Sequence, residues 1–364
     1  MQIHFFGSSL VSAYWNGAAT YYRGILKALA ARGHSITFYE PDAYERQNHR
    51  DIADPPWAKV VVYSGTDDVE AMRAVERAGR QADVLVKASG VGVFDPVLEA
   101  AVLTFRRRGG LAVYWDVDAP ATLERLKRDR SDPLRGFLPS YDIVLTYGGG
   151  APIVRGFRAL GARRCVPVYN ALDPETHFPV LAEERFRCTL ALLANRLPDR
   201  ERRVEEFFLK PAARLPDEAF LLGGNGWDHR ACPANVRRVG HVYTHDHNAF
   251  NTSALAVLNV ARDSMATLGF SPATRVFEAA GAAACIITDA WEGIEAFLEP
   301  GREILVAASG DEVANHVAKL TLARARAIGI AAKRRVLAQH TYALRAREVE
   351  ALFDGGCAPM EVSA

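Results

Sequence analysis

Short apolar runs recur along the first half of the chain, and small or polar residues follow each of them. The runs lie at 2–6, 35–39, 60–63, 83–87, 111–115 and 141–146. Stretches with helical spacing of apolar residues separate several of these runs, as in 69–80 and 94–107. Short strands that alternate with helices are typical of parallel βαβ units, so this half is predicted to form an open α/β sheet. Ligands of such sheets bind at the loops beyond the carboxyl ends of the strands.

A second series of apolar runs begins after Cys188. Its members lie at 189–193, 219–222, 236–239, 254–260, 285–288 and 304–307. The segment 170–179 between the two series combines Asn170 with two prolines and has no regular period, which indicates an irregular connector at a domain boundary. We therefore predict two α/β domains, 1–173 and 174–340, and a last amphipathic helix over 342–353. The length of 364 residues also suits two domains.

Composition excludes several classes of partner. The 44 Lys and Arg residues balance 43 Asp and Glu residues, so no overall field attracts nucleic acid or an anionic membrane. The five cysteines lie far apart, without metal-ligand or disulfide-framework spacing, which indicates reduced thiols. No apolar run is long enough to span a bilayer, and no signal peptide precedes the first strand. We expect a cytoplasmic protein without a transmembrane segment, a nucleic-acid partner or a metal site.

Polar and small residues at the strand ends of the first half are candidates for ligand binding. They are Gly7, Ser8, Asn16 and Gly17 around the first loop, and Lys87 and Ser89 at the end of the fourth run. The first loop lacks the G-x-G-x-x-G pattern, which argues against a dinucleotide-dependent oxidoreductase. Lys87 suits a phosphate or a carboxylate, although a lysine at a strand end more often lies at the surface.

Asp116 and Asp118 follow the strand at 111–115 and are the candidate catalytic residues of this half. A carboxylate at a strand end can accept a proton from a bound hydroxyl group. The alternative is structural: one aspartate caps the helix that begins near Ala121, and the other is a solvated loop carboxylate. Their spacing of two residues favours a ligand-facing role for one of them only.

The stretch 271–306 carries the strongest pattern of the second half. A Ser271-Pro272 turn leads into a helix for which Thr274 is the expected N-cap, and Arg275 and Glu278 share one face of its first turn. A helix N-terminus with an arginine and a glutamate suits a ligand that joins phosphate to ribose. The alternative interpretation is an i,i+3 ion pair at the surface.

Further candidates of the second half lie at other strand ends. They are Asn195, Arg196, Arg200, Gly224 and His241. Asn195 either contacts a ligand or caps the helix that follows it. His241 either binds phosphate or merely ends its strand.

The residues of 271–306 and several other segments resemble group 1 glycosyltransferases, with the spore-maturation (CgeB-like) branch as the nearest. The segments that carry the resemblance are 271–279 through Asp289, Phe297, 300–303, 340–342 with 345–346, the N-terminal 16–19 and 31–37, and 170–174. The resemblance covers nearly the whole chain and is strongest over 259–301.

This resemblance implies the GT-B fold: two Rossmann-like domains that face each other across a cleft, with a C-terminal helix (341–357) packed back on the first. It implies a hexosyltransferase-type enzyme that uses a nucleoside-diphosphate sugar without a metal ion or other cofactor. By motif position, Glu278 would bind the donor ribose, and Arg275 with Arg196 or Arg200 would bind the diphosphate. The candidates of the first domain would then face an acceptor, either a small molecule or a macromolecule.

One departure from the family pattern concerns the reaction. Retaining members carry a second glutamate, and its position falls on Phe270 here. The stereochemical outcome therefore stays open. An inverting enzyme would need a general base, for which Asp118 or Asp116 is the candidate. In a retaining enzyme an oxygen of the leaving phosphate could serve instead, and the two aspartates would only orient the acceptor. Two other functions stay open: a nucleotide-sugar epimerase on the same fold, and a non-catalytic nucleotide-sugar-binding protein.

Overall fold

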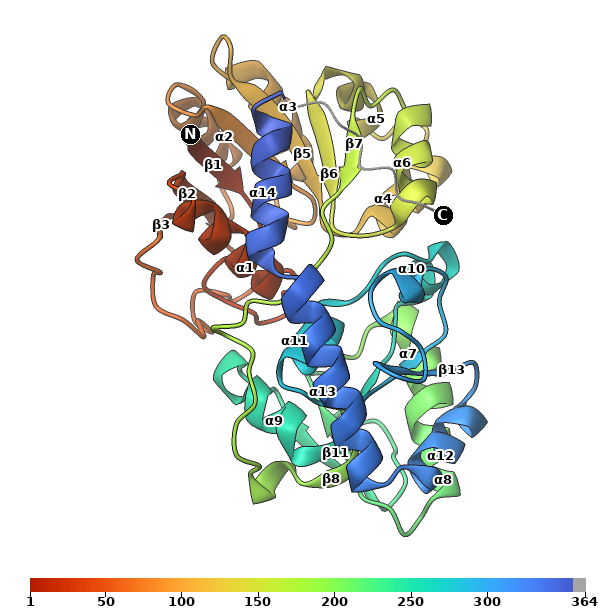
Figure 1. Ribbon diagram of the computed structural model, residues 1–364. Coiled ribbons are helices and arrows are strands. Elements are labelled where there is room, and N and C mark those ends of the chain that lie inside the picture. Colours follow the sequence, from red (N-terminus) through yellow and green to blue (C-terminus); the bar gives the residue numbers. More distant parts are fainter. Residues whose placement is uncertain (356–364) are drawn as a thin grey trace. The chain divides into compact units, whose positions relative to one another are not determined.

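The computed structural model describes residues 1–355. Contacts divide the chain into two units (Figure 1). Within the described residues, unit 1 comprises 1–147, 154–168 and 342–355, and unit 2 comprises 148–153 and 169–341. No helix within 1–355 is both long enough and apolar enough to cross a membrane.

Unit 1 contains a seven-stranded sheet in which every pairing is parallel. Its strands are β1 (Gln2–Phe6), β2 (Ser35–Asp42), β3 (Ala58–Ser64), β4 (Val84–Ala88), β5 (Leu111–Asp116), β6 (Ile143–Thr146) and β7 (Cys165–Pro167). The strand order is β3-β2-β1-β4-β5-β6-β7. The direction of winding reverses between β1 and β4, and a crevice for ligands is expected at such a switch point.

Helices connect successive strands of this sheet, except β2 and β3, which a loop joins. They are α1 (Ala19–Ala31), α2 (Asp68–Gly79), α3 (Asp95–Phe105), α4 (Ala119–Arg128), α5 (Leu134–Phe137) and α6 (Gly150–Ala159). Strands β4 and β5 are almost completely buried, as expected for central parallel strands that helices cover on both faces.

The last helix, α14 (Tyr342–Phe353), packs against α1 in unit 1 (Figure 1). Gly24 of α1 makes this close approach possible, because a β-carbon there would overlap the Tyr342 ring. The Tyr21 ring also contacts the Tyr342 ring, with 6.0 Å between ring centroids. The helix predicted at 342–353 is confirmed.

Unit 2 contains a second parallel sheet, of six strands. They are β8 (Cys188–Leu193), β9 (Phe220–Gly223), β10 (Val236–Gly240), β11 (Ala254–Asn259), β12 (Ile286–Asp289) and β13 (Leu305–Ala307). Their order is β10-β9-β8-β11-β12-β13, so the switch point lies between β8 and β11. The run at 254–260, which is compatible with a helix or a strand, is therefore a strand.

Several helices accompany this sheet, and those at 198–204, 210–214, 310–319 and 322–339 contribute to one hydrophobic core. The helices of unit 2 are α7 (Pro198–Val204), α8 (Lys210–Arg214), α9 (His247–Ser253), α10 (Asp263–Leu268), α11 (Thr274–Gly281), α12 (Gly310–Lys319) and α13 (Leu322–Gln339). Alternate strand residues such as Leu190 and Leu192 enter this core, where they join helix residues such as Phe208, Val313 and Ile328. The packed sheet fixes the positions of the loops at its carboxyl edge.

Candidate functional site

The loops that follow β8 and β9 are joined in unit 2. The Asn195 side chain accepts a hydrogen bond from the Asn225 backbone N–H at 2.9 Å, and the Arg196 N–H donates to the Asn225 carbonyl at 2.9 Å. Asn195 thus organises the neighbouring loop, and no side-chain cap bond is found at the start of α7. The capping interpretation of Asn195 is therefore wrong.

Gly224 and His241 lie in the same loop cluster. Gly224 has a φ of 116°, and a β-carbon at this position would overlap the Ala194 carbonyl, so only glycine fits. The Asn225 amide nitrogen lies 3.4 Å from His241 Nδ1, which ties in the loop after β10. The structure therefore brings together four predicted residues from three loops: Asn195, Arg196, Gly224 and His241.

Three arginines form ion pairs near this cluster: Arg196 before α7, Arg203 within α7 and Arg262 after β11. Arg196 donates to Glu201 at 2.7 Å, and Arg262 donates to Asp199 at 2.5 Å. Arg203 pairs with the buried Asp289, whose carboxylate also accepts the Ala261 N–H at 3.1 Å. Burial raises the pKa of Asp289, and the charge of Arg203 opposes that rise. The Asp289 contacts join α7 to the ends of β11 and β12.

The turn before α11 has an unusual backbone. Gly269 and Phe270 both have positive φ values, of 70° and 47°, and Ser271 Oγ donates to the Gly269 carbonyl at 3.0 Å. Such a conformation is uncommon for phenylalanine and costs about 1 kcal/mol or more. Thr274 is the first residue of α11, and Ala273 occupies the N-cap position without a side-chain bond. The prediction of Thr274 as N-cap is wrong.

Glu278 is buried, and three nitrogen-bearing side chains surround its carboxylate. Arg275 Nη1 lies 3.5 Å from Oε2, His247 Nδ1 lies 3.8 Å from Oε2, and His177 Nε2 lies 3.9 Å from Oε1. The two imidazole rings are stacked, with 6.1 Å between their centroids. The Arg275–Glu278 pair is thus buried, and the alternative of a surface ion pair is wrong.

Burial controls the protonation of this cluster. It lowers the pKa of His247 to about 3, and the charge of Arg275 adds to this effect while Glu278 opposes it. Burial also lowers the pKa of His177, and the charge of Glu278 opposes this decrease. Both imidazoles are therefore neutral near pH 7, which leaves Arg275 and Glu278 as the charged pair.

The histidines also connect Glu278 with the strand-end loops. His247 Nε2 lies 3.3 Å from the Val242 carbonyl, just after β10 and His241. The sequence contains no motif for His177 and His247, because they lie far apart on separate segments and only folding brings them to Glu278.

In unit 1 the predicted residues around the first loop bond to one another. Ser8 Oγ donates to Asn16 Oδ1 at 2.9 Å, and Asn16 Nδ2 donates to the Ser9 and Ser12 carbonyls at 2.9 Å each. Gly7 contacts Phe38 so closely that a β-carbon would lie 2.5 Å from its ring, while Gly17 is exposed. The loop after β1 is thus a closed turn held by its own polar groups.

Lys87 is completely buried, so the interpretation of Lys87 as a surface residue is wrong. Its ammonium group donates to Asp95 Oδ1 and to the Ala88 carbonyl, both at 2.6 Å. Ser89 donates to Asp116 Oδ1 at 2.7 Å and accepts from the Val117 N–H at 2.9 Å. Lys87 and Ser89 therefore fix the ends of β4 and β5.

Asp116 is buried at the end of β5, whereas Asp118 is partly exposed just before α4. Asp116 Oδ1 also accepts the Asp118 N–H at 2.8 Å, and among residues 1–355 its buried Oδ2 has no hydrogen-bond partner. Burial raises the pKa of Asp116 to about 6, and the bonds from Ser89 and the Asp118 N–H oppose that rise. Asp118 occupies the N-cap position of α4 without a side-chain cap bond, and Asp116 is buried, so Asp116 is not the solvated carboxylate of the structural alternative.

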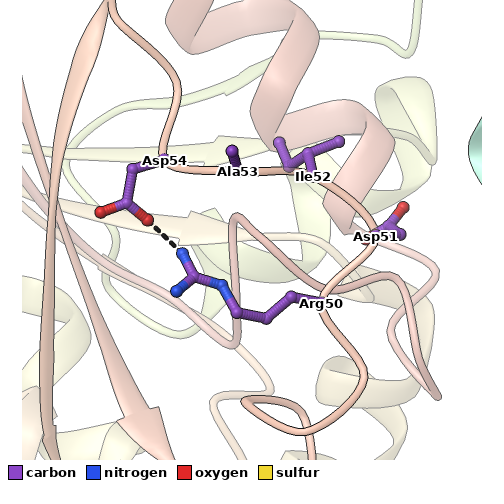
Figure 2. Close-up of a pocket in the computed structure, with 5 residues that line it drawn as sticks. All are labelled: Arg50, Asp51, Ile52, Ala53 and Asp54. Atoms are coloured by element: carbon purple, nitrogen blue, oxygen red, sulfur yellow. Dashed lines mark hydrogen bonds and ion pairs between the residues drawn. The ribbon is translucent and has the colours of Figure 1, made fainter.

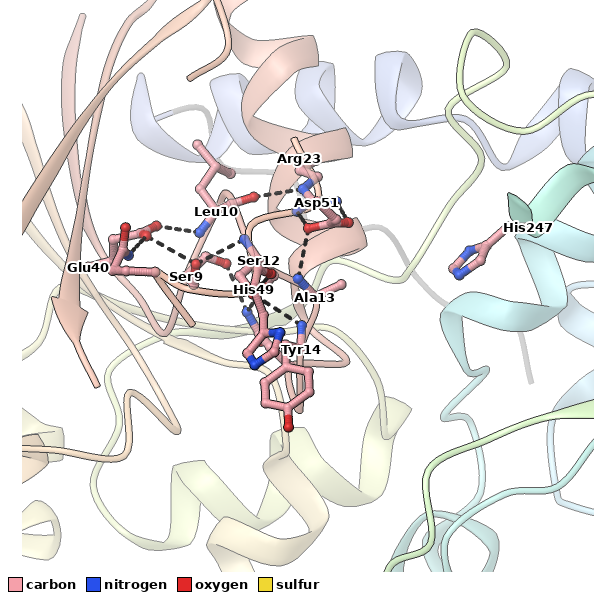
Figure 3. Close-up of polar contacts among 12 residues, drawn as sticks. Ser9, Leu10, Ser12, Ala13, Tyr14, Arg23, Glu40, His49, Asp51 and His247 are labelled. Carbon is pink, nitrogen blue, oxygen red and sulfur yellow. Dashed lines mark hydrogen bonds and ion pairs between the residues drawn. The ribbon is translucent and has the colours of Figure 1, made fainter. Parts of the chain in front are cut away.

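A hollow of about 490 Å³ opens beside the loop between β2 and β3 in unit 1. Figure 2 shows its lining, residues 50–54, in which the Arg50 and Asp54 side chains form an ion pair. This segment also supports the first loop, because Asp51 accepts from Arg23 and from the Ala13 N–H (Figure 3). No group of three or more His, Cys, Asp or Glu side chains within 1–355 is arranged to hold a metal ion.

Two parallel α/β units, each with polar loops at the switch point of its sheet, define the GT-B glycosyltransferase fold. Solved structures of this fold match nearly the whole chain. Sucrose-phosphate synthase from Thermosynechococcus elongatus has a TM-score of 0.73 and 14% identity, with 98% of both chains covered. HepE from Anabaena in complex with UDP and glucose has a TM-score of 0.70 and 12% identity, with 98% of this chain and all of that one covered. An α-glucosyltransferase in complex with UDP and a 13-mer DNA has a TM-score of 0.68 and 9% identity, with 97% and 99% covered.

The match to a sequence family covers a shorter part of the chain than the match to solved structures. Residues 200–351 match the model of a family described as glycosyl transferase-like, and this range includes Arg275 and Glu278. The matched range is less than half of the chain. A search of curated protein sequences gives no significant match. The GT-B fold therefore spans nearly the whole chain, and the glycosyl transferase-like sequence pattern lies in its C-terminal part.

Proposed function

We propose that this protein transfers a sugar from a nucleoside-diphosphate sugar to an acceptor hydroxyl group without a divalent metal. The arrangement around Glu278 carries the proposal. This carboxylate lies in the first turns of α11, paired with Arg275 and connected through His247 to the loop after β10. The same residues lie in the range that matches the glycosyl transferase-like family.

In this proposal the donor binds to unit 2. Glu278 accepts hydrogen bonds from the ribose hydroxyl groups, and Arg275 and Arg196 bind the diphosphate, whose charge grows as it leaves. Thr274, Ser271, Arg200 and the Asn195–Gly224–His241 loop cluster form the rest of the donor site. Relatives of this fold were solved with UDP, which makes a UDP-sugar the first donor to test. Membership of the CgeB-like branch and a hexose as the transferred sugar are parts of the same proposal.

The acceptor binds to unit 1, and Asp118 is the proposed general base. The acceptor oxygen forms a bond to the anomeric carbon, the bond from that carbon to the diphosphate oxygen breaks, and the acceptor proton moves to Asp118. Asp116 is a positioning residue, because it is buried and holds the Asp118 N–H. The outcome is then inversion, which agrees with the presence of Phe270 where retaining relatives carry a glutamate.

Thermal shift with UDP, GDP, ADP and dTDP tests donor binding. We expect one of them to raise the melting temperature, and Glu278→Gln to weaken its affinity about tenfold or more, since a hydrogen bond to a charged group contributes about 1.5–3 kcal/mol. Each shift is measured against the variant's own melting temperature, because the substitution leaves Arg275 buried without its counter-ion. Glu295→Gln is the matched control, since Glu295 is an exposed glutamate of the same unit. The proposed donor site is wrong if no nucleoside diphosphate stabilises the protein. It is also wrong if Glu278→Gln and Glu295→Gln bind the nucleotide with equal affinity.

Turnover then separates transfer from the other two functions. The stabilising nucleotide is supplied as its sugar conjugates with EDTA present, and both nucleotide release and sugar products are measured. An epimerase would change the donor sugar without releasing nucleotide, and a binding protein would do neither. We expect Asp118→Asn to abolish release while nucleotide affinity is kept. Unchanged release in that variant excludes Asp118 as the base, and loss of release with EDTA contradicts metal independence.

A further inference from the structure

Arg46 lies beside the switch point of the sheet in unit 1. It follows β2, and its side chain is buried, with 7% of the residue exposed. Nη1 donates to the Ser8 carbonyl at 3.3 Å and lies 3.5 Å from the Val91 carbonyl. Ser8 follows β1 and Val91 follows β4, so the guanidinium group touches both loops that border the switch point.

Among residues 1–355, no Asp or Glu oxygen forms an ion pair with Arg46, and its buried Nε has no hydrogen-bond partner. Glu40 acts on Arg46 electrostatically, but its carboxylate is bonded to other groups. It accepts hydrogen bonds from the Leu10 N–H at 2.6 Å and from Ser9 Oγ at 3.1 Å (Figure 3). Gln47 Nε2 also donates to it, at 2.6 Å. Lys87, the other buried cation near the switch point, is neutralised by Asp95.

Such an arrangement is costly unless an anion completes it. A buried ion without a partner costs several kcal/mol, even after the protein relaxes. Burial accordingly lowers the pKa of Arg46. The protein also holds Tyr44 over the guanidinium group, at 4.9 Å from the ring centroid, by a hydrogen bond of 2.7 Å from its hydroxyl to the Gly92 carbonyl. Tyr44 and Glu45 both have left-handed backbones, with φ of 58° and 57°, which adds about 1–3 kcal/mol of strain each.

We propose that Arg46 binds an oxyanion, a phosphate or a carboxylate carried by the acceptor, at the switch point of unit 1. A guanidinium group offers a planar pair of donors that matches either anion, and its buried Nε is one donor still available. The backbone carbonyls of Ser8 and Val91 hold the group in place, and Tyr44 covers it. That the acceptor carries this anion depends on the proposed function, whereas anion binding at Arg46 does not.

Thermal shift with inorganic phosphate and with acetate tests the site without any donor. Sodium chloride at matched ionic strength is the reference, and the Arg46→Met variant measures the general stabilisation that excluded salts such as phosphate produce. We expect phosphate or acetate to raise the melting temperature of the wild type above the sodium chloride reference, and to raise that of Arg46→Met by less; this difference is the excess. Arg23→Met is the control, because Arg23 is an arginine of the same unit that Asp51 neutralises at 2.7 Å, so this variant should keep the excess.

The ligand-free melting temperatures distinguish this role from a structural one. If Arg46 binds an anion, Arg46→Met removes an uncompensated buried charge and leaves the stability of the ligand-free protein equal or higher. If Arg46 serves only to tie two loops together, the variant is less stable and the wild type shows no anion-specific shift. A shift in Arg46→Met equal to that of the wild type places the anion elsewhere. Either of the last two results overturns the proposal.

Transfer assays identify which anion the acceptor carries. Glucose 6-phosphate and glucuronate are compared with glucose as acceptors. We expect one of the two anionic sugars to be preferred, and Arg46→Met to raise its KM at least tenfold while affinity for the nucleoside diphosphate is unchanged. Equal use of glucose and both anionic sugars by the wild type contradicts the inference but leaves the proposed function intact. Failure of donor binding, in contrast, would refute the proposed function and leave the phosphate titration valid.

Discussion

The side chain of His247 illustrates how burial sets charge at the residue scale. It lies at the start of α9 between the Glu278 carboxylate and the Val242 carbonyl, and burial lowers its pKa to about 3. The unfolded chain binds a proton on this histidine near pH 6.5, whereas the folded chain does not until about pH 3. The folded state therefore loses stability as the pH falls from about 6.5 toward 3, and the full contribution is present above 6.5.

This linkage gives a measurable pH dependence. Between pH 6.5 and 4.5 the free energy of unfolding should fall by about 2–3 kcal/mol because of His247 alone, at 1.36 kcal/mol per pKa unit. His247→Gln keeps a donor for the Val242 carbonyl and does not titrate, so its decline over this range should be shallower. Urea denaturation at a series of pH values measures the difference. His245→Gln, an exposed histidine two residues away, should follow the wild type. Parallel curves for wild type and His247→Gln contradict the assignment.

At the scale of elements, the contact of α1 with α14 depends on one missing side chain. Glycine in the middle of a helix costs about 1 kcal/mol relative to alanine, so an unconstrained Gly24 would be stabilised by substitution. The β-carbon of an alanine at this position would overlap the Tyr342 ring. Packing therefore overrides helix propensity here.

We expect Gly24→Ala to destabilise the protein by about 1–3 kcal/mol, which lowers the melting temperature by several degrees. A double-mutant cycle isolates the contact. In a Tyr342→Ala background the same substitution should become neutral or stabilising, because the ring that it displaces is gone. Thermal denaturation of the four proteins gives the coupling. Additive effects would show that Gly24 is not constrained by Tyr342.

At the scale of the whole molecule, the two proposed ligands belong to separate units. A nucleoside diphosphate should protect the loops after β8, β9 and β10 and the start of α11, all in unit 2. An anion at Arg46 should protect the loops after β1, β2 and β4, all in unit 1. Ligands slow exchange mainly where they suppress local opening of the chain.

Hydrogen exchange with mass spectrometry checks this division. Samples with UDP, with inorganic phosphate and with sodium chloride are compared, peptide by peptide. We expect the UDP pattern within 169–341 and the Arg46-dependent part of the phosphate pattern within 1–147. The Arg46→Met variant serves as the control that removes the second pattern. Protection by UDP confined to 1–147 contradicts the assignment of the donor to unit 2.

Most elements of the fold follow from local sequence. The apolar runs at 2–6 and 189–193 become β1 and β8, because short buried strands between helices have a pattern that neighbouring residues determine. The candidate loops follow as well, since the carboxyl ends of parallel strands share one edge. Asn195, Gly224 and His241 are brought together in this way. The exact start of α11 does not follow from residue type: Thr274 has the residue type of an N-cap, but it is the first helical residue and Ala273 takes the N-cap position.

The sequence by itself determined two α/β sheets, the loops at their carboxyl edges, and Arg275 and Glu278 on one helix face, because each depends on residues that are close in the chain. Only the tertiary structure decided the environment of those residues. It placed His177 and His247 against Glu278, paired Lys87 with Asp95, and left Arg46 buried without a carboxylate. Such environments depend on side chains from distant segments and on exclusion of water, and no local pattern records either. Charge and protonation in both sites are therefore properties of the fold.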